Sequence, residues 1–177
     1  HGADLFAGNQ MLDALLGGAA AGTHAGEWVK HRKFANSQTA HDAVQAAQAD
    51  HSAVSEASEE GVVRIGHVVT KVREAVQTAL GYNRSASELQ SAVESLEAAG
   101  VLAESIHVDQ ASLIANTNIV EIARVQASAR LALVSAQSAL AREESRGCHH
   151  RSDFTESSED HLHHYTVNQV GEVNTLA

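Results

Sequence analysis

Apolar residues recur with a helical period along much of the chain. Gly81 is preceded by six apolar residues that follow one another at spacings of three or four: Val62, Ile65, Val69, Val72, Val76 and Leu80. This spacing gathers apolar side chains on one helical face, and a glycine just past the last turn is typical of a helix C-terminus. The segment is therefore predicted to be an amphipathic helix that stops before Gly81.

The next helix has a recognisable start. Ser85 and Glu88 form an S-x-x-E capping box, in which the side chains serve backbone N–H groups of the first turn. The helix is predicted to run from this point to about Gly100. Residues 101–115 are predicted to be an extended or irregular connection.

A last, longer helix follows this connection. Asn116 or Thr117 is its expected N-cap, because a side-chain oxygen there can accept a hydrogen bond from the first turn. The predicted helix continues to Arg146 and stops at Gly147. Its expected buried face consists of Ile119, Ile122, Ala129, Leu133, Ala136 and Leu140.

The first third of the chain has a weaker pattern. Residues 1–9 are glycine-rich and irregular, and apolar residues from Met11 onward predict a helix that fades at a glycine between positions 17 and 22. Residues 26–36 are predicted to be a loop. Residues 38–57 are alanine-rich and favour a helix by propensity rather than by a strong apolar face.

These elements predict a mostly α fold. Three or four helices pack side by side as an antiparallel bundle that buries small aliphatic side chains. The two ends of the chain have no comparable face, and residues 148–177 are polar, histidine-rich and without a period. Each end is expected to lie on another part of a larger structure.

Composition narrows the function classes. The 177 residues carry 12 Lys and Arg against 22 Asp and Glu, a formal net charge of −10, which disfavours binding to a phosphate backbone. No apolar run approaches the roughly 18–20 residues that span a bilayer. One cysteine, Cys148, excludes an internal disulfide framework and a cysteine-based zinc finger.

Twelve histidines raise the question of a metal site. The densest group combines His149 and His150 with three histidines at positions 161, 163 and 164. Imidazoles at short spacing suit zinc, but no carboxylate or thiolate is arranged around them in a known pattern. We therefore expect no metal site, and we expect Cys148 to be an inert small residue despite its histidine neighbours.

The chain begins with His1, and neither a charged nor an apolar leader segment follows. No targeting segment is therefore expected within it. The opening residues read like the middle of a loop, which leaves three interpretations open: a processed start, a fragment, or a protein whose remainder is a separate chain.

One segment resembles a known signature. Flavoprotein subunits of succinate dehydrogenase and fumarate reductase carry a helix that ends S-A-x-A-R-x-E-S-R-G-A-H-x-R-x-D, and L-aspartate oxidases share its E-S-R-G part. The matching positions here are Ser138, Ala139, Ala141, Arg142, Glu144, Ser145, Arg146, Gly147, His149, Arg151 and Asp153.

Other segments agree with this resemblance in the same order along the chain. Residues 1–11 are similar to the family's H-G-A-N-R-L-G-x-N-S-L, residues 82–85 to its Y-R-T/S, and residues 116–119 to its N-T-D-L. Residues 159–164 resemble its D-D-x-x-W/F-L-K-H segment, which favours succinate dehydrogenase or fumarate reductase over aspartate oxidase. The resemblance covers only the last third of such a subunit.

The resemblance implies three regions. Residues 1–33 would be the end of an FAD-binding α/β domain, with its last loop and helix against the flavin. Residues 34–147 would form the helical bundle, and residues 148–177 an irregular tail that docks on the flavin domain.

The same resemblance implies FAD as cofactor and assigns His1, Asn9, Gln10 and Met11 to its binding. In the family, backbone N–H groups at the start of this helix face the pyrimidine edge of the flavin. A helix N-terminus offers unpaired donors and the positive end of a dipole, which favours the negative charge of a reduced flavin. Backbone donors tolerate changes of side chain at these positions.

One departure bears on the substrate. The family's arginine in H-G-A-N-R binds a substrate carboxylate through its planar fork, and Leu5 stands at that position. Asp4, in place of the family's asparagine, would repel a dicarboxylate. No residue of this chain is assigned as the catalytic acid or as a substrate ligand.

Arg146, His149 and Arg151 fall in the segment that follows the last bundle helix. The resemblance implies a structural docking role for all three, without direct chemistry, and leaves direct contact with the flavin as the alternative. Arg146, expected at a helix C-terminus, would also interact favourably with the helix dipole.

The resemblance therefore implies the C-terminal part of an FAD-dependent oxidoreductase that interconverts a dicarboxylate pair and passes electrons to an iron–sulfur subunit. This piece is not expected to be active without the rest of the flavoprotein, and the family binds no metal in this subunit. A catalytically degenerate or structural helical subunit and an L-aspartate oxidase-like flavoenzyme are the alternatives. A cytoplasmic or matrix-face location, peripheral to a membrane at most, would follow.

Overall fold

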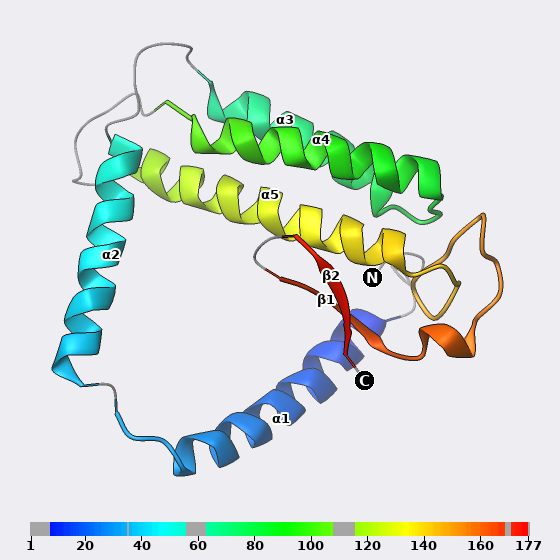
Figure 1. Ribbon diagram of the computed structural model, residues 1–177, viewed down its shortest axis with the longest axis horizontal. Helices are drawn as coiled ribbons and strands as arrows, with labels where there is room; N and C mark the ends of the chain where they lie inside the picture. Colours follow the sequence, from blue (N-terminus) through cyan, green and yellow to red (C-terminus); the bar gives the residue numbers. More distant parts are fainter. Residues whose placement is uncertain (1–7, 35, 56–62, 108–115, 169–170, 177) are drawn as a thin grey trace.

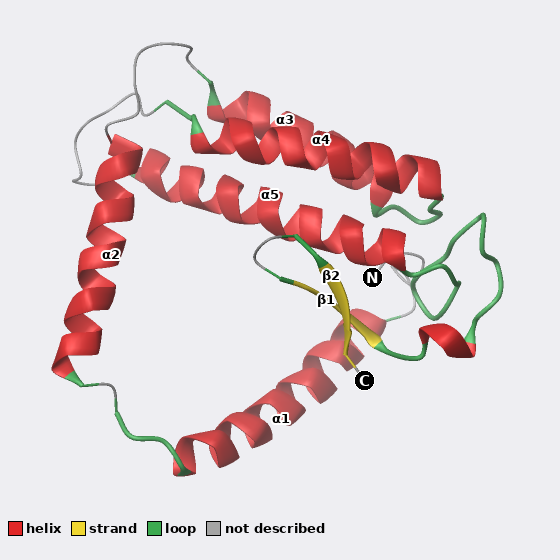
Figure 2. Ribbon diagram, in the orientation of Figure 1, coloured by secondary structure: helices red, strands yellow, loops and turns green. Residues whose placement is uncertain are grey.

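The computed structural model describes residues 8–34, 36–55, 63–107, 116–168 and 171–176. Within these ranges the chain is mostly helical, as predicted, with a small antiparallel sheet near its C-terminus (Figure 2). None of the helices in these ranges combines the length and apolar character needed to cross a membrane.

Three helices form the packed centre: α3 (Ile65–Ala79), α4 (Ala86–Glu104) and α5 (Thr117–Ala141). Figure 1 shows them side by side, with α4 antiparallel to both α3 and α5. The end of the bundle where α3 begins is tied by a backbone hydrogen bond from His107 N to the Val63 carbonyl oxygen, 3.0 Å long. The predicted antiparallel bundle is confirmed.

The core of the bundle is built from small side chains. More than half of its buried residues are alanines, which lets the helix backbones approach closely and compensates for the shortage of aromatic residues. The buried members are Val68, Val72, Ala75, Ala79, Leu89, Ala92, Val93, Leu96, Ala99, Ala103, Ile106, Ile122, Val125, Ala129, Ala132, Ala136 and Ala139.

Both predicted N-caps are confirmed. The Ser85 hydroxyl oxygen accepts a hydrogen bond from Glu88 N and donates one to the Glu88 carboxylate, 2.7 Å away. The Asn116 side-chain oxygen accepts from Asn118 N at 3.1 Å. Gly81 follows the C-cap of α3 as predicted, and a Cβ there would approach the Gln77 carbonyl oxygen to 3.0 Å.

Two helices of the first third of the chain lie outside the bundle (Figure 1). The α2 helix (Ser37–Ser55) confirms the helix predicted for residues 38–57. The α1 helix (Asn9–Lys30) is longer than predicted, so the expected fading between positions 17 and 22 and the loop from residue 26 to residue 30 were wrong. Glycines inside α1 lower helix propensity without ending the helix.

Two other boundaries were also wrong. The α4 helix continues through Gly100 to Glu104, so the connection predicted from residue 101 starts later. The α5 helix ends at Ala141 instead of Arg146, and residues 142–151 form a compact polar loop. The part of the connection at residues 108–115 lies outside the described residues.

The tail contains structure that the sequence did not reveal. A short 3-10 helix, η2 (Glu159–His161), leads into β1 (His164–Val167), which pairs antiparallel with β2 (Val173–Leu176). Both strands contact α5 on the side away from α3 and α4 (Figure 1). The tail thus closes over the C-terminal half of α5.

Candidate functional site

The C-terminus of α5 is capped by an arginine from the tail. The Arg151 guanidinium is fully buried, and its Nη1 donates to the carbonyl oxygens of Ala139, Leu140 and Arg142 at 3.1–3.2 Å. The last carbonyls of a helix have no partner within the helix and carry the negative end of its dipole. Arg151 therefore supplies the cation that the sequence analysis assigned to Arg146.

Asp153 completes this arrangement at a second helix end. Its carboxylate accepts two hydrogen bonds from Arg151, each 2.8 Å long, and a third from Ala86 N at the start of α4, also 2.8 Å. The bidentate pairing with Arg151 is the main cause that lowers the pKa of Asp153. One ion pair thus neutralises the positive end of α4 and the negative end of α5 together.

Glu144 is the second buried charge of the loop. Its carboxylate accepts hydrogen bonds from Arg142, Arg146 and the backbone N–H of Ser158, between 2.5 and 3.1 Å long. Burial alone would raise the pKa of Glu144, but these donors outweigh burial and lower the pKa to about 2. Glu144 therefore stays ionised and ties α5 to the tail.

Arg142 extends the contact to the strand region. Its guanidinium donates to the carbonyl oxygens of His161 and His163 and lies 4.8 Å from the ring centre of Tyr165. Cation–π contact and carbonyl hydrogen bonds together fix the η2–β1 segment on the end of α5. The tail is thus anchored by polar contacts.

His149 links this loop to the connection between α3 and α4. Its Nδ1 lies 2.8 Å from Nη1 of Arg84, which can only donate, so Nδ1 accepts and Nε2 carries the proton. Nε2 donates to the Arg142 carbonyl oxygen, 3.2 Å away. Burial, reinforced by the neighbouring arginines, lowers the pKa of His149, so its imidazole is neutral at physiological pH.

A tight turn presents Cys148 to the start of α1. Arg146 and His149 exchange two backbone hydrogen bonds of 2.9 and 3.0 Å, and Gly147 adopts a left-handed φ of 57°. The Asn9 side-chain amide lies 3.8 Å from the Cys148 sulfur. The first residue of α1 therefore contacts the polar loop.

The start of α1 offers backbone donors that have no partner within the helix. Gly8 occupies the N-cap with a left-handed φ of 79° and has no side chain to cap the helix. Met11 N donates to the Gly8 carbonyl oxygen at 3.1 Å. The N–H groups of Asn9 and Gln10 lie so close to the start of the helix that no carbonyl of the helix can accept from them. Asn9, Gln10 and Met11 are exposed. The geometry fits an anionic or hydrogen-bond-accepting edge.

The predicted site residues divide into three groups. His1 and Leu5 lie outside the described residues. Asn9, Gln10 and Met11 share the first turn of α1, and Arg146, His149 and Arg151 share the polar loop. The contact between Asn9 and Cys148 connects the second group to the third.

The histidines of the tail form ring contacts. His161 Nδ1 lies 2.6 Å from the Tyr165 hydroxyl, and the rings of His163 and Tyr165 meet edge to face with centres 4.7 Å apart. Among the described ranges, no group of three or more histidine, cysteine, aspartate and glutamate side chains is arranged to hold a metal ion.

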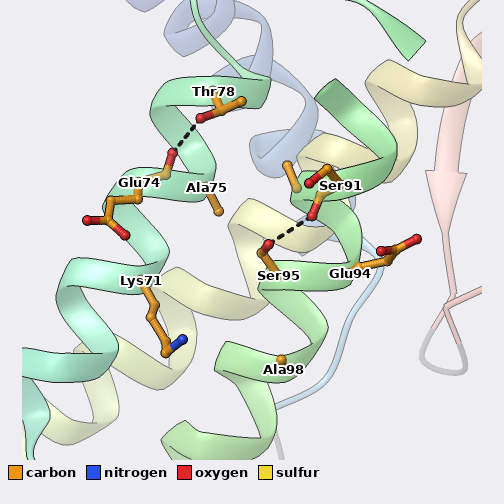
Figure 3. A pocket seen from close by; sticks show the side chains of 9 residues that line it. Lys71, Glu74, Ala75, Thr78, Ser91, Glu94, Ser95 and Ala98 are labelled. Carbon is orange, nitrogen blue, oxygen red and sulfur yellow. Dashed lines mark hydrogen bonds between the residues drawn. The ribbon is translucent and has the colours of Figure 1, made fainter. Parts of the chain in front are cut away.

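A groove of about 440 Å³ lies between α3 and α4 (Figure 3). Two of its hydroxyls are already engaged, because Thr78 donates to the Glu74 carbonyl and Ser95 to the Ser91 carbonyl of their own helices. Lys71 and Glu94 line opposite sides of this open surface. The groove lacks the convergent polar groups that define a ligand site.

The fold and the polar loop define a class: a helical C-terminal domain of flavoprotein subunits. The sequence model described as the fumarate reductase flavoprotein C-terminus matches residues 69–175. The chain therefore belongs to this family, which is the one that the sequence analysis named.

Curated relatives agree with this assignment. A fumarate reductase flavoprotein subunit of Mycobacterium tuberculosis is 26% identical over 94% of this chain, and a succinate dehydrogenase flavoprotein subunit of Rickettsia bellii is 26% identical over 99%. An uncharacterized FAD-dependent oxidoreductase of Methanocaldococcus jannaschii is 27% identical over 90%. The chain spans 28–29% of the length of these relatives.

Solved structures show the same fold. A variant of the E. coli quinol fumarate reductase FrdA matches 88% of this chain with a TM-score of 0.72 and 20% identity, and the match covers 27% of that chain. The Mycobacterium smegmatis Sdh1 complex matches 88% of this chain with a TM-score of 0.63 and 17% identity, covering 27% of its chain. At these identities the likeness establishes the fold alone.

Sequence reasoning assigned no role to several residues of the polar loop. Arg142, Glu144 and Asp153 were matched to the family signature but not given partners, and Arg84 was noted only within a second short motif. Their partners are brought together by the fold, across separations such as the 67 residues between Ala86 and Asp153. The sequence signal that could have pointed to these residues is the high density of charged side chains in residues 142–153.

Proposed function

We propose that this chain is the C-terminal part of an FAD-dependent oxidoreductase of the succinate dehydrogenase and fumarate reductase type. The observation that carries the proposal is α1, a 22-residue helix whose N-terminus has no side-chain cap and contacts the polar loop. When bound, FAD would supply hydride transfer to or from a carbon–carbon bond of a dicarboxylate.

Asn9, Gln10 and Met11 would face the flavin with their backbone. The N–H groups of Asn9 and Gln10 would donate to the pyrimidine edge, and the positive end of the α1 dipole would stabilise negative charge there. Side-chain identity matters little for this role, so the glutamine at position 10 is compatible with it. The proposal also includes His1 as a flavin contact, on the basis of the family resemblance.

The proposal includes the three regions of the chain that the resemblance implies. Residues 1–33 would complete the FAD-binding domain, residues 34–147 would form the bundle, and residues 148–177 would dock on the flavin domain. Arg146 is suited to docking because its side chain is 37% exposed. His149 and Arg151 would act indirectly by holding the loop that positions Cys148 and Asn9.

The exposed apolar side chains of α1 support the first boundary. Met11 and Leu15 are 77% and 70% exposed, and Leu12 and Leu16 lie beside them on the helix. An isolated helix in water is only marginally stable unless its apolar face is packed. The remainder of the flavoprotein, on the same or a separate chain, would cover this face.

The substrate and the electron acceptor are proposed on the resemblance. A dicarboxylate pair would be interconverted, and electrons would pass to an iron–sulfur subunit in a complex peripheral to a membrane. Leu5, at the position of the family's substrate-binding arginine, favours a second candidate, a catalytically degenerate flavoprotein. Succinate-dependent reduction of an artificial acceptor by the natively purified protein distinguishes the two.

A substitution that removes a backbone N–H group tests the flavin role directly. Gln10→Pro removes one N–H from the first helical turn, where proline is tolerated. We expect flavin affinity of the natively purified protein to fall about 10-fold or more, since a hydrogen bond to a charged group is worth about 1.5–3 kcal/mol. Gln10→Ala, the matched control, should bind flavin normally. Equal affinities in the two variants, with equal helical content, would contradict the proposal.

A further inference from the structure

Arg84 is a partly buried cation without an acidic partner. Its Nη1 donates to His149, and its Nε is buried with no hydrogen-bond partner. No carboxylate in the described ranges lies within ion-pair distance of its guanidinium, whereas Arg142, Arg146 and Arg151 all have one. A desolvated charge without a counter-ion is costly, so this position calls for an anion.

Arg84 lines an open pocket of about 300 Å³ at the C-terminal half of α5. No acidic side chain lines it, and its other walls are Ser135, Ser138, Ala139, Arg142, His149 and Tyr165. The hydroxyls of Ser135 and Ser138 donate to carbonyls of α5 one turn earlier. Both η nitrogens of Arg142 already donate to Glu144 and to carbonyls of the tail. The guanidinium of Arg84 is therefore the main donor left for a ligand.

The geometry around Arg84 leaves one nitrogen of its guanidinium available. Because His149 occupies Nη1 and Nε is buried, Nη2 is the donor that remains for a ligand, and a charged N–H donor forms a strong hydrogen bond to a carboxylate oxygen. His149 is held as a neutral acceptor by its own bond to the Arg142 carbonyl, so it orients Arg84 without adding charge. Burial is the main cause that lowers the pKa of Arg84; the nearby Cys148 acts in the opposite direction and Arg151 in the same one.

We propose that this pocket binds a small carboxylate anion, with Nη2 of Arg84 as its donor and the Arg84 guanidinium as its positive charge. The site borders the loop whose Cys148 contacts the start of α1, and it does not depend on the proposed oxidoreductase activity. A monocarboxylate is sufficient for the chemistry described, because one guanidinium nitrogen receives one carboxylate oxygen.

Binding is tested on the natively purified protein, with flavin bound and after flavin removal. Acetate and succinate are titrated against sodium chloride at matched ionic strength, with calorimetry and thermal unfolding as readouts. We expect both carboxylates to bind and to raise the melting temperature relative to chloride in both flavin states. Absence of binding by either carboxylate, or succinate binding that requires flavin, would overturn the proposal.

Two substitutions locate the site. Arg84→Gln should weaken acetate binding by about tenfold or more, while Arg84→Lys should retain part of the affinity because it keeps the charge. Arg124→Gln is the matched control, because Arg124 is an exposed arginine of α5 paired with Glu121, and it should bind acetate normally. Unchanged affinity in Arg84→Gln would overturn the assignment.

A second variant covers the case in which Arg84→Gln does not fold. Ser138→Asp places a carboxylate inside the same pocket, where it can pair with the guanidinium groups. We expect this variant to fold and to lose its response to acetate, since the site would carry its own anion. An acetate response equal to that of the unmodified protein would contradict the proposal.

Discussion

Arg151 shows how a single residue connects distant parts of this chain. Its guanidinium is fully buried, yet every nitrogen of the fork donates either to the C-terminal carbonyls of α5 or to Asp153. A buried charge is tolerated when it is paired and fully hydrogen-bonded, and it becomes costly when one partner is removed. The polar loop is therefore a set of mutually dependent residues.

Arg151→Lys tests this dependence. Lysine keeps the charge but lacks the planar fork that serves Asp153 and the α5 carbonyls together. We expect the free energy of unfolding to fall by about 3–5 kcal/mol in denaturant titrations. Arg124→Lys, on the exposed face of α5, should change it by less than about 0.5 kcal/mol. Similar small effects in both variants would show that the buried network is not cooperative.

Glu144 gives a prediction about pH. Its folded pKa of about 2 lies below its ordinary value of 4.5, so its stabilising contribution is complete above pH 4.5 and is lost as pH falls through about 2. Glu144→Gln should cost about 3 kcal/mol at pH 7, because two arginines lose their buried partner. The difference in unfolding free energy between the two proteins should shrink between pH 4.5 and pH 2. A difference that is constant with pH would contradict the assignment.

Local sequence predicted individual roles only where the partner is near. Ser85 and Asn116 were identified as N-caps because the N–H groups they serve lie two or three residues away. The cation expected at the end of α5 was assigned to Arg146, whereas Arg151 holds it. That partnership depends on a chain reversal at residues 146–149, where Gly147 favours a turn but does not identify which arginine will reach the end of α5.

At the scale of elements, the glycines explain the wrong boundaries. The helices α1 and α4 run through glycines at which the sequence predicted breaks. Glycine lowers helix propensity by about 1 kcal/mol relative to alanine, which is too little to end a helix whose flanking residues favour it. The α5 helix instead ends before its predicted boundary. Arg151, which lies outside the helix, donates hydrogen bonds to its last carbonyls there.

Gly100 allows this explanation to be tested. It lies inside α4, its φ is not positive, and a Cβ added there would meet nothing within 4 Å. We expect Gly100→Ala to raise the unfolding free energy by about 0.5–1 kcal/mol, through helix propensity alone. Gly147→Ala, at a left-handed φ of 57°, should lower it by a comparable amount. Thermal melts of both variants check the two signs, and destabilisation by Gly100→Ala would contradict the account.

At the scale of the whole molecule, the chain combines a self-sufficient bundle with helices that lack a partner. The bundle and its class could be predicted because period and capping agree over residues 62–140. The β1–β2 hairpin could not, because strands of four residues are too short for their alternation to stand out, and they depend on contact with α5. The first turn of α1 was identified as a site by resemblance, and its uncapped N–H groups give that assignment a physical basis.

The central claim is that this chain completes a flavin site in a larger flavoprotein. Its most direct test is the native mass of the protein purified from its own cells, recorded on the same sample as its visible absorption spectrum. The account predicts a mass well above 18.6 kDa together with the absorption bands of an oxidised flavin. A native mass of 18.6 kDa without flavin absorption would contradict it.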